Sequence, residues 1–138
     1  MIRVIRFRAW MKEERQMVMV AQIDFTFDLV TGYRVWKSTG PDEETRMYEE
    51  SSKCELMQFT GLHDKNGKEI WEGDVVGQRI GKTTRECLVV EWNEKYGQWV
   101  VDETRPLHEW IWWWGIHFKC GEVLGNIYEN PELLGENS

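Results

Sequence analysis

The chain has 138 residues, of which 41% are hydrophobic and 30% charged, and its formal net charge at pH 7 is −7. This composition indicates a globular protein with room for one hydrophobic core, and it excludes a disordered or fibrous protein. The negative charge argues against nonspecific binding to double-stranded DNA, because such binding depends on cations that displace phosphate counterions.

The N-terminal part of the chain predicts β-strands. Strands are expected over residues 2–10, 17–23, 25–29 and 33–36; residues 25–29 alternate apolar and polar side chains, and residues 17–21 form an apolar run. The polar segment 12–16 predicts that the first two strands form a hairpin with a longer loop. Residues 1–20 also carry a local charge of +3, from Arg3, Arg6, Arg8, Lys12 and Arg15 against Glu13 and Glu14. We interpret these cations as a solvated strand face, and a local basic patch is the alternative.

Residues 37–53 lack apolar periodicity and are strongly acidic. We predict a loop or a linker between subdomains in this segment. The alternative is a short helix that begins at Asp42, because acidic residues in the first turn interact favourably with the helix dipole.

Turn signals are clear between residues 56 and 76. A predicted strand over residues 56–62 leads to Asn66-Gly67, which predicts a type I′ hairpin turn because both residue types tolerate positive φ angles. Ile70-Trp71 is expected on the return strand. Gly73-Asp74 then predicts a tight turn before a buried strand at Val75-Val76.

The following segment predicts a second hairpin. Residues 77–85 are interpreted as a loop, residues 87–92 as a strand, residues 93–97 as a turn and residues 98–101 as the return strand. Short strands this close together are typical of small barrels and sandwiches, and we favour an SH3-like barrel from Ile70 onward. The predicted fold is mainly β. It has an N-terminal β-hairpin subdomain with the acidic loop over residues 1–55 and a small SH3-like barrel over residues 56–138.

Four of the nine tryptophans lie between residues 107 and 118. Ile111 to Trp114 are four consecutive large apolar residues, so neither a helix nor a strand period fits, and the segment is either a buried helix turn or an oligomer contact. The rings that cannot turn inward predict a protein contact and self-association. The candidate interaction residues are Trp110, Trp112, Trp113 and Trp114. Residues 123–128 predict a last strand, and Asn130-Pro131 the start of a helical turn.

The cellular compartment is inferred from the cysteines and from apolar runs. Cys54, Cys87 and Cys120 include no CxxC pair and suit a reducing environment. No segment resembles a signal peptide, and none approaches the roughly 20 apolar residues of a membrane span. We therefore expect a cytoplasmic protein without a membrane partner.

Three segments resemble the YopX family of phage proteins. They are the segment 5–10 (IRFRAW), the segment 57–76 (MQFTGLHDKNGKEIWEGDVV) and the segment 123–134 (VLGNIYENPELL). The resemblance spans nearly the whole chain. It implies a largely β fold and an origin in a phage or prophage of a mainly Gram-positive bacterium, but no assigned activity and no catalytic residues. The chain departs from the family pattern in residues 20–55 and in the Trp-rich run after Leu107.

Three groups of residues could carry chemistry, and each has a simpler structural interpretation. His63-Asp64 could provide a general base, but adjacent residues on a strand point to opposite faces. His108-Glu109, His117 and Cys120 lack the paired spacing of zinc sites. Glu72-Gly73-Asp74 could bind a divalent ion, yet a strand-entry turn explains it better. We expect a protein that is not an enzyme and has no cofactor and no metal.

The leading hypothesis is a non-enzymatic, homo-oligomeric protein that binds a host or phage protein through exposed aromatic rings. The alternative is a protein that binds single-stranded nucleic acid or a nucleotide, because rings can stack on bases while cations contact phosphates. The position of the exposed rings distinguishes the two. Rings beside Arg3, Arg6, Arg8 and Arg15 favour nucleic acid, and rings among glutamates favour a protein partner.

Overall fold

The computed structural model describes residues 3–28, 32–38, 48–80, 82–103, 105–111 and 121–135. These residues form mainly antiparallel β-sheet with short helices, which confirms the predicted mainly β fold. The chain divides into two compact units. The N-terminal unit is Val4–Gln58, and the C-terminal unit is Phe59–Ser138 together with Met1–Arg3. No helix among the described residues is long and apolar enough to cross a membrane.

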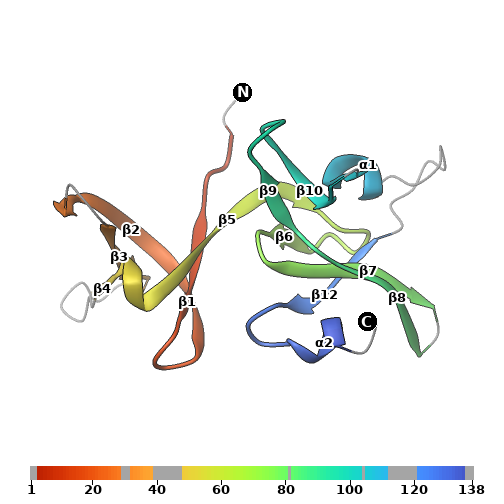
Figure 1. Ribbon diagram of the computed structural model, residues 1–138, viewed down its shortest axis with the longest axis horizontal. Helices are drawn as coiled ribbons and strands as arrows, with labels where there is room; N and C mark the ends of the chain where they lie inside the picture. The colour runs from red at the N-terminus through yellow and green to blue at the C-terminus, as the bar shows by residue number, and fades with distance from the viewer. Residues whose placement is uncertain are drawn as a thin grey trace. The chain divides into compact units, whose positions relative to one another are not determined.

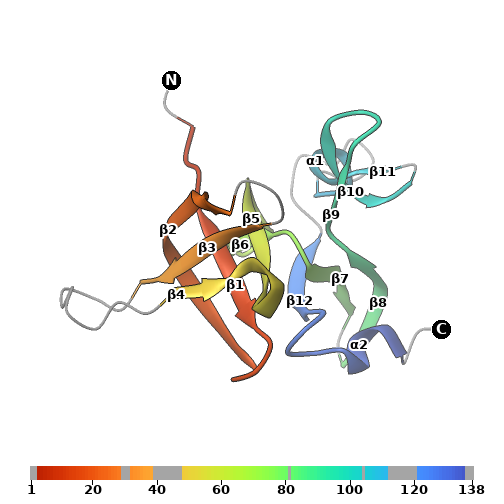
Figure 2. The same ribbon diagram turned by 60° about the vertical axis from the view of Figure 1, so that its left-hand side comes forward.

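The N-terminal unit is one antiparallel meander, seen from two directions in Figures 1 and 2. Its strands are β1 (Phe7–Met11), β2 (Gln16–Asp28), β3 (Gly32–Lys37), β4 (Tyr48–Glu50) and the first half of β5 (Cys54–His63). A single 3₁₀ turn, η2 (Ser51–Lys53), separates β4 from β5. The strand order is β4-β3-β2-β1-β5, so the last strand returns to lie beside the first.

Alternation along these strands places one set of side chains in a core. The buried members are Ala9, Met11, Val35 and Cys54, and the half-buried ones around them are Val18, Val20, Tyr33 and Leu56. The long strand β2 stays in register with both neighbours because a bulge between Val20 and Gln22 shifts its pairing with β3. Without this bulge every side chain beyond it would change faces.

The C-terminal unit begins with the second half of β5, which pairs with β6 (Glu69–Trp71). The remaining strands are β7 (Asp74–Ile80), β8 (Thr83–Val89), β9 (Glu91–Asn93), β10 (Gln98–Asp102), β11 (Arg105–Pro106) and β12 (Glu122–Asn126). Two short helices are α1 (Leu107–Ile111) and α2 (Glu132–Gly135). The strand orders are β12-β7-β8 and β11-β10-β9.

The two units share one topology. In the C-terminal unit β8 and β9 are separated only by Val90, so the two can be counted as one strand. With that strand second, β7, β10 and β11 complete a four-strand meander like that of β1 to β4. In each unit a helical turn follows the fourth strand in sequence, and the fifth strand pairs with the first. The chain therefore uses the same strand arrangement twice. The SH3-like barrel stays a prediction.

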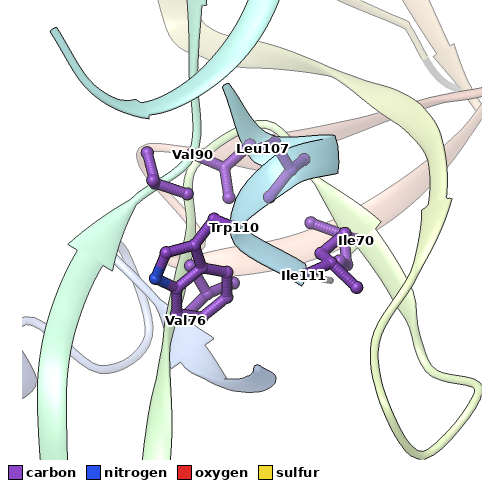
Figure 3. Packing of buried hydrophobic residues seen from close by; sticks show 7 residues of the cluster. Ile70, Val76, Val90, Leu107, Trp110 and Ile111 are labelled. Carbon is purple, nitrogen blue, oxygen red and sulfur yellow. The ribbon is translucent and has the colours of Figure 1, made fainter. Parts of the chain in front are cut away.

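The core of the C-terminal unit is built around α1. Its buried members are Ile70, Val76, Val90, Val101, Leu107, Trp110 and Ile111. Figure 3 shows the Trp110 ring next to Val76, and Ile111 next to Ile70. These helix residues are spaced i, i+3 and i+4, so all three turn to one side. Residues 107–111 form a buried helix turn, whereas residues 112–118 of the predicted segment lie outside the described residues, so the oligomer contact there stays a prediction.

Two predictions of local structure are wrong. Residues 77–85 are not a loop, because β7 continues to Ile80 and pairs with β8 from Thr83 onward. The sequence of this hairpin is mainly polar, so it lacks the apolar pattern from which a strand is predicted. Backbone pairing does not require apolar side chains. Within the segment 37–53, β4 and η2 occupy residues 48–53. Residues 39–47, with the alternative helix from Asp42, lie outside the described residues.

The turn at Asn66-Gly67 is also not of type I′. Gly67 has a φ of 80°, but Asn66 keeps a negative φ. The N–H of Gly67 donates to the carbonyl of Asp64 at 3.0 Å, and the N–H of Asp64 donates to the carbonyl of Lys68 at 2.8 Å. This pattern is a type I turn followed by a left-handed glycine. Propensity alone missed the Asp64 side chain, which accepts the N–H groups of Asn66 and Lys68.

Candidate interaction surfaces

The carboxylate of Asp64 holds a turn together. The residue is 2% exposed. Its Oδ1 accepts the backbone N–H groups of Asn66 at 2.8 Å and Lys68 at 2.9 Å, and its Oδ2 accepts that of Val123 at 2.9 Å. The adjacent His63 is exposed. Two of these charge-assisted bonds therefore close the turn after β5 and the third joins it to β12, which is a structural role for the carboxylate.

The segment Glu72-Gly73-Asp74 forms the predicted turn. Gly73 has a φ of 82°, and its N–H donates to the carbonyl of Val90 at 2.9 Å. The buried Asp74 carboxylate accepts the N–H of Trp71 at 2.7 Å. In the part of the chain that the structure describes, no group of three His, Cys, Asp or Glu side chains could hold a metal ion.

Of the four candidate interaction residues in the Trp-rich run, the structure describes Trp110. Trp110 is 5% exposed and lies in the core of the C-terminal unit. Its indole N–H donates to Oε2 of Glu86 at 3.3 Å. Trp112, Trp113 and Trp114 lie outside the described residues, as do His117 and Cys120. His108 and Glu109, which the sequence grouped with the latter two, are both exposed on α1.

The hairpin of β9 and β10 presents a cluster of aromatic rings, and we call residues 91–99 the tryptophan hairpin. Trp92 and Trp99 lie directly opposite each other in the register, with ring centroids 5.0 Å apart at an interplanar angle of 70°. Trp92 is 45% exposed, and Tyr96 in the turn is 63% exposed. In both ribbon views this turn lies at the end of the C-terminal unit opposite to α2 (Figures 1 and 2).

The turn of the tryptophan hairpin is well defined by hydrogen bonds. Asn93 accepts the N–H of Tyr96 with its side-chain oxygen at 3.0 Å and the N–H of Gly97 with its carbonyl at 2.9 Å. Gly97 has a φ of 61°, which suits glycine. Because the backbone is held in this way, the exposed rings are carried on an ordered support. Glu91 and Glu94 are exposed beside them.

A second aromatic surface lies on the N-terminal unit, on the side of its sheet opposite the core. Val18 pairs with Ala9 toward the core, so the flanking Met17 and Met19 project to the other side. Val35 faces the core, and its neighbours on β3 project outward in the same way. We define this outer face by Trp10, Met17, Met19, Arg34, Trp36 and Tyr48.

Contacts among these side chains make the outer face continuous across β3 and β4. The rings of Trp36 and Tyr48 have centroids 5.0 Å apart. The Arg34 guanidinium carbon lies 4.6 Å from the centre of the Tyr48 ring. Met19 and Tyr48 are each 42% exposed. The result is an apolar sheet face with a cation stacked on it.

Charges of both signs occur on this outer face. Arg34 pairs in the register with Asp24 on one side and with Glu50 on the other. Trp10 is opposite Glu55 on β5, and Arg8 is opposite Met19 on β2. The hydrogen bonds that Thr26 donates to the Asp24 carboxylate lower the pKa of Asp24, so this group stays ionised under ordinary conditions.

Sequence patterns missed both surfaces for different reasons. Trp92 and Trp99 flank a predicted turn, and counting outward from that turn would have shown that they face each other. The outer face depends on the bulge in β2 and on the short strand β4. The sequences of these two segments show no apolar alternation, so they cannot be distinguished from loops. The Trp-rich run drew attention because its residues are consecutive in sequence, whereas surface clusters are assembled from several strands.

Two comparisons relate the chain to known proteins. The family model described as YopX protein matches residues 6–135. The crystal structure of protein EF1440 from Enterococcus faecalis is similar, with a TM-score of 0.61 and 25% sequence identity. The alignment covers 95% of this chain and 98% of that one. No curated protein matches the chain. The likeness to EF1440 thus extends over nearly the full length of both chains.

Proposed function

This chain belongs to the YopX family, and from that premise we propose that it is a phage or prophage protein of the bacterial cytoplasm. We propose further that it works without catalysis, by associating with itself and with a host or phage protein. The carboxylates of Asp64 and Asp74 support the absence of catalysis, because both accept backbone N–H groups in turns. The family resemblance supports the phage origin.

The outer face of the N-terminal unit carries the proposal of self-association. Its rings and methionines form an apolar surface on a sheet, and aromatic rings of this kind bury about 150–250 Å² each in a contact. Its charges are mixed, with Arg8 and Arg34 near Asp24, Glu50 and Glu55. A two-fold contact brings the same patch against itself, so that cations of one copy can face carboxylates of the other. A mixed patch suits such a contact better than a patch of one sign.

Light scattering after size exclusion tests this self-association. We expect an oligomeric wild type and a lower mass for the double variant Met19→Gln, Tyr48→Ser, in which the exposed members of the outer face become polar. Phe25→Ser is the matched control, because Phe25 is an exposed ring outside the outer face. A monomeric wild type contradicts the proposal. An oligomer that the double variant leaves unchanged would move the contact elsewhere, for example to Trp112, Trp113 and Trp114.

Binding of single-stranded nucleic acid is a second candidate function, and the Arg34 guanidinium over the Tyr48 ring favours it. Rings and cations side by side are the components of surfaces that stack bases and contact phosphates. Arg8 and Trp10, two residues apart on β1, add a further cation and ring. Asp24, Glu50 and Glu55 oppose this function, because carboxylates repel phosphates. Anisotropy of a labelled oligothymidylate tests it, with Arg34→Glu expected to abolish binding.

The finer fold assignment is also a proposal. A four-strand meander, a helical turn and a fifth strand beside the first support an SH3-like barrel in the C-terminal unit. The same order in the N-terminal unit supports a second barrel, where the sequence predicted only a hairpin subdomain. A crystal structure tests this through hydrogen bonds between β10 and the chain preceding β12.

A further inference from the structure

The tryptophan hairpin lies at the edge of its sheet. Among the described residues, β9 pairs on one side, with β10, in the order β11-β10-β9. A strand edge offers backbone N–H and C=O groups to an added strand, and this is a recurrent mode of peptide recognition. The hairpin thus combines an edge strand with exposed rings on the same short segment.

The rings of this hairpin suit cations. Lys95 already places its ammonium nitrogen 5.2 Å from the centre of the Tyr96 ring, so a cation is accommodated there within the chain itself. Trp92 is opposite Trp99 and is 45% exposed. Indole rings bind ammonium and guanidinium groups more strongly than other side-chain rings do.

The charges beside the rings favour the same kind of partner. Residues 91–99 contain two carboxylates, Glu91 and Glu94, and one cation, Lys95. Both glutamates are exposed on or next to β9. A basic partner would gain attraction from both carboxylates as well as contact with the rings.

The same carboxylates disfavour two other occupants. A second copy that added its own β9 about a two-fold axis would bring like charges close together, which is destabilising between adjacent strands. Single-stranded nucleic acid would bring phosphates to Glu91 and Glu94, and surfaces that bind it are cationic. The rings at this site lie among glutamates, the arrangement that favours a protein partner.

We propose that the tryptophan hairpin binds an extended, arginine- or lysine-rich segment of another protein, which adds as a strand beside β9 and places its cations on Trp92 and between Glu91 and Glu94. The tryptophan hairpin is thus a second interaction surface, distinct from the outer face. It does not depend on self-association through the outer face, because the residues involved belong to a different unit.

A labelled short peptide of repeated Arg-Arg-Val triplets, whose neighbouring arginines project to both faces of an added strand, tests the proposal by fluorescence anisotropy on the full chain. We expect measurable binding that weakens as salt is added, and much weaker binding of the matching peptide of Glu and Val. Trp92→Ala should weaken binding about tenfold, the equivalent of one desolvated cation contact. Glu91→Lys with Glu94→Lys should abolish it.

Controls separate loss of the site from loss of the fold. Glu13→Lys with Glu14→Lys makes the same charge change on exposed residues of the β1–β2 turn, and it should bind the peptide as the wild type does. Because Trp92 contacts Trp99, Trp92→Ala could destabilise the hairpin, and thermal melting checks this. The glutamate pair is exposed, so its variant keeps the test decisive if Trp92→Ala unfolds.

Three outcomes overturn the proposal. The first is a dissociation constant weaker than about 1 mM for the Arg-Arg-Val peptide. The second is equal weakening by the two double-lysine variants, which would show a general charge effect. The third is binding of oligothymidylate that Trp92→Ala removes, which would assign the hairpin to nucleic acid. An outer face that fails to mediate self-association leaves all three measurements unaffected, so the two proposals fail separately.

Discussion

The indole N–H of Trp110 donates to the Oε2 of Glu86 at 3.3 Å, and this bond joins α1 to β8. Glu86 has a φ of 53°, in the left-handed region that glutamate rarely adopts. Its other carboxylate oxygen lies 3.3 Å from the guanidinium of Arg105, which also pairs with Asp102. Contacts from α1 and β11 thus accompany the strained backbone at this position.

The first prediction separates the hydrogen bond of Glu86 from its charge. Glu86→Gln keeps an acceptor for Trp110 and loses only a half-exposed ion pair, so we expect a loss of less than about 1 kcal/mol in the free energy of unfolding. Glu86→Leu leaves the Trp110 N–H without its acceptor and should cost on the order of 2 kcal/mol. Urea denaturation measures both. Equal losses would show that the charge, and not the bond to Trp110, matters.

The second prediction concerns the space beside Trp110. A Cβ atom at Gly121 would overlap the Trp110 ring, which is fixed in the core. Gly121→Ala should therefore destabilise the protein by about 1–3 kcal/mol through overpacking. Gly135→Ala is the control, because a Cβ at Gly135 meets nothing within 4 Å. Thermal melting compares the two variants, and similar midpoints would contradict the prediction.

The third prediction concerns Gly67. Its φ of 80° is accessible to glycine and is strained for a β-branched residue, so Gly67→Val should cost on the order of 1–2 kcal/mol. Nothing lies within 4 Å of the position that a Cβ would take, so crowding does not contribute. Gly67→Asn should recover part of the loss, because asparagine tolerates left-handed conformations. A melting midpoint unchanged in the valine variant would refute the turn geometry.

The fourth prediction concerns Asp64. Asp64→Ala removes the acceptor of three backbone N–H groups, at a cost of about 1–3 kcal/mol for each donor that stays buried. Asp64→Asn keeps an acceptor oxygen and should cost less than Asp64→Ala. Hydrogen exchange provides a sharper check, because the amide of Val123 should lose protection in the alanine variant. Retained protection there would show that β12 does not depend on this carboxylate.

The fifth prediction concerns the Cys54 thiol. Burial raises the pKa of Cys54, and the carboxylates of Glu49 and Glu55 raise it further. In a Cys120→Ser variant, which leaves two thiols, iodoacetamide should therefore modify the half-buried Cys87 before Cys54 at about pH 8. Mass spectrometry of the digested protein measures the order. Faster modification of Cys54 would contradict its burial.

The same shift has a consequence for stability. The folded state keeps Cys54 protonated, whereas the unfolded chain ionises it at the ordinary thiol pKa. The contribution is therefore complete below the ordinary pKa and is lost as the pH rises through the raised folded pKa. Urea denaturation above pH 9 should show a steeper loss for the wild type than for Cys54→Ala. Parallel curves would contradict the shift.

Strands with clear alternation could be predicted from the sequence, because burial on one face leaves a period of two. The hairpin of β1 and β2, the strand β3 and the turn at Gly73 agree with these patterns. The hairpin at Ile80 and Thr83 could not be predicted, since its backbone pairs without an apolar pattern. The type of turn at Asn66 depended on a side chain outside the dipeptide.

Surfaces were harder to predict than strands. The sequence singled out Trp110 because it adjoins other large residues, yet the helix turn directs its ring into the core. Trp36 and Tyr48 are 12 positions apart and meet only because β3 pairs with β4. Contacts between neighbouring strands depend on their register. The register of β2 with β3 depends on the bulge between Val20 and Gln22, which the local sequence does not predict.

The return of each fifth strand to its first has a consequence for synthesis on the ribosome. The N-terminal unit contains all its strands once residue 58 has emerged, so it can complete its pairing while the rest of the chain is still being made. The C-terminal unit cannot complete its pairing so early, because β7 pairs with β12, which lies at residues 122–126. Until then one edge of β7 is unpaired, next to the apolar pair Val75 and Val76. A nascent chain arrested in this interval would carry a folded N-terminal unit and an unpaired β7 edge that is prone to aggregation.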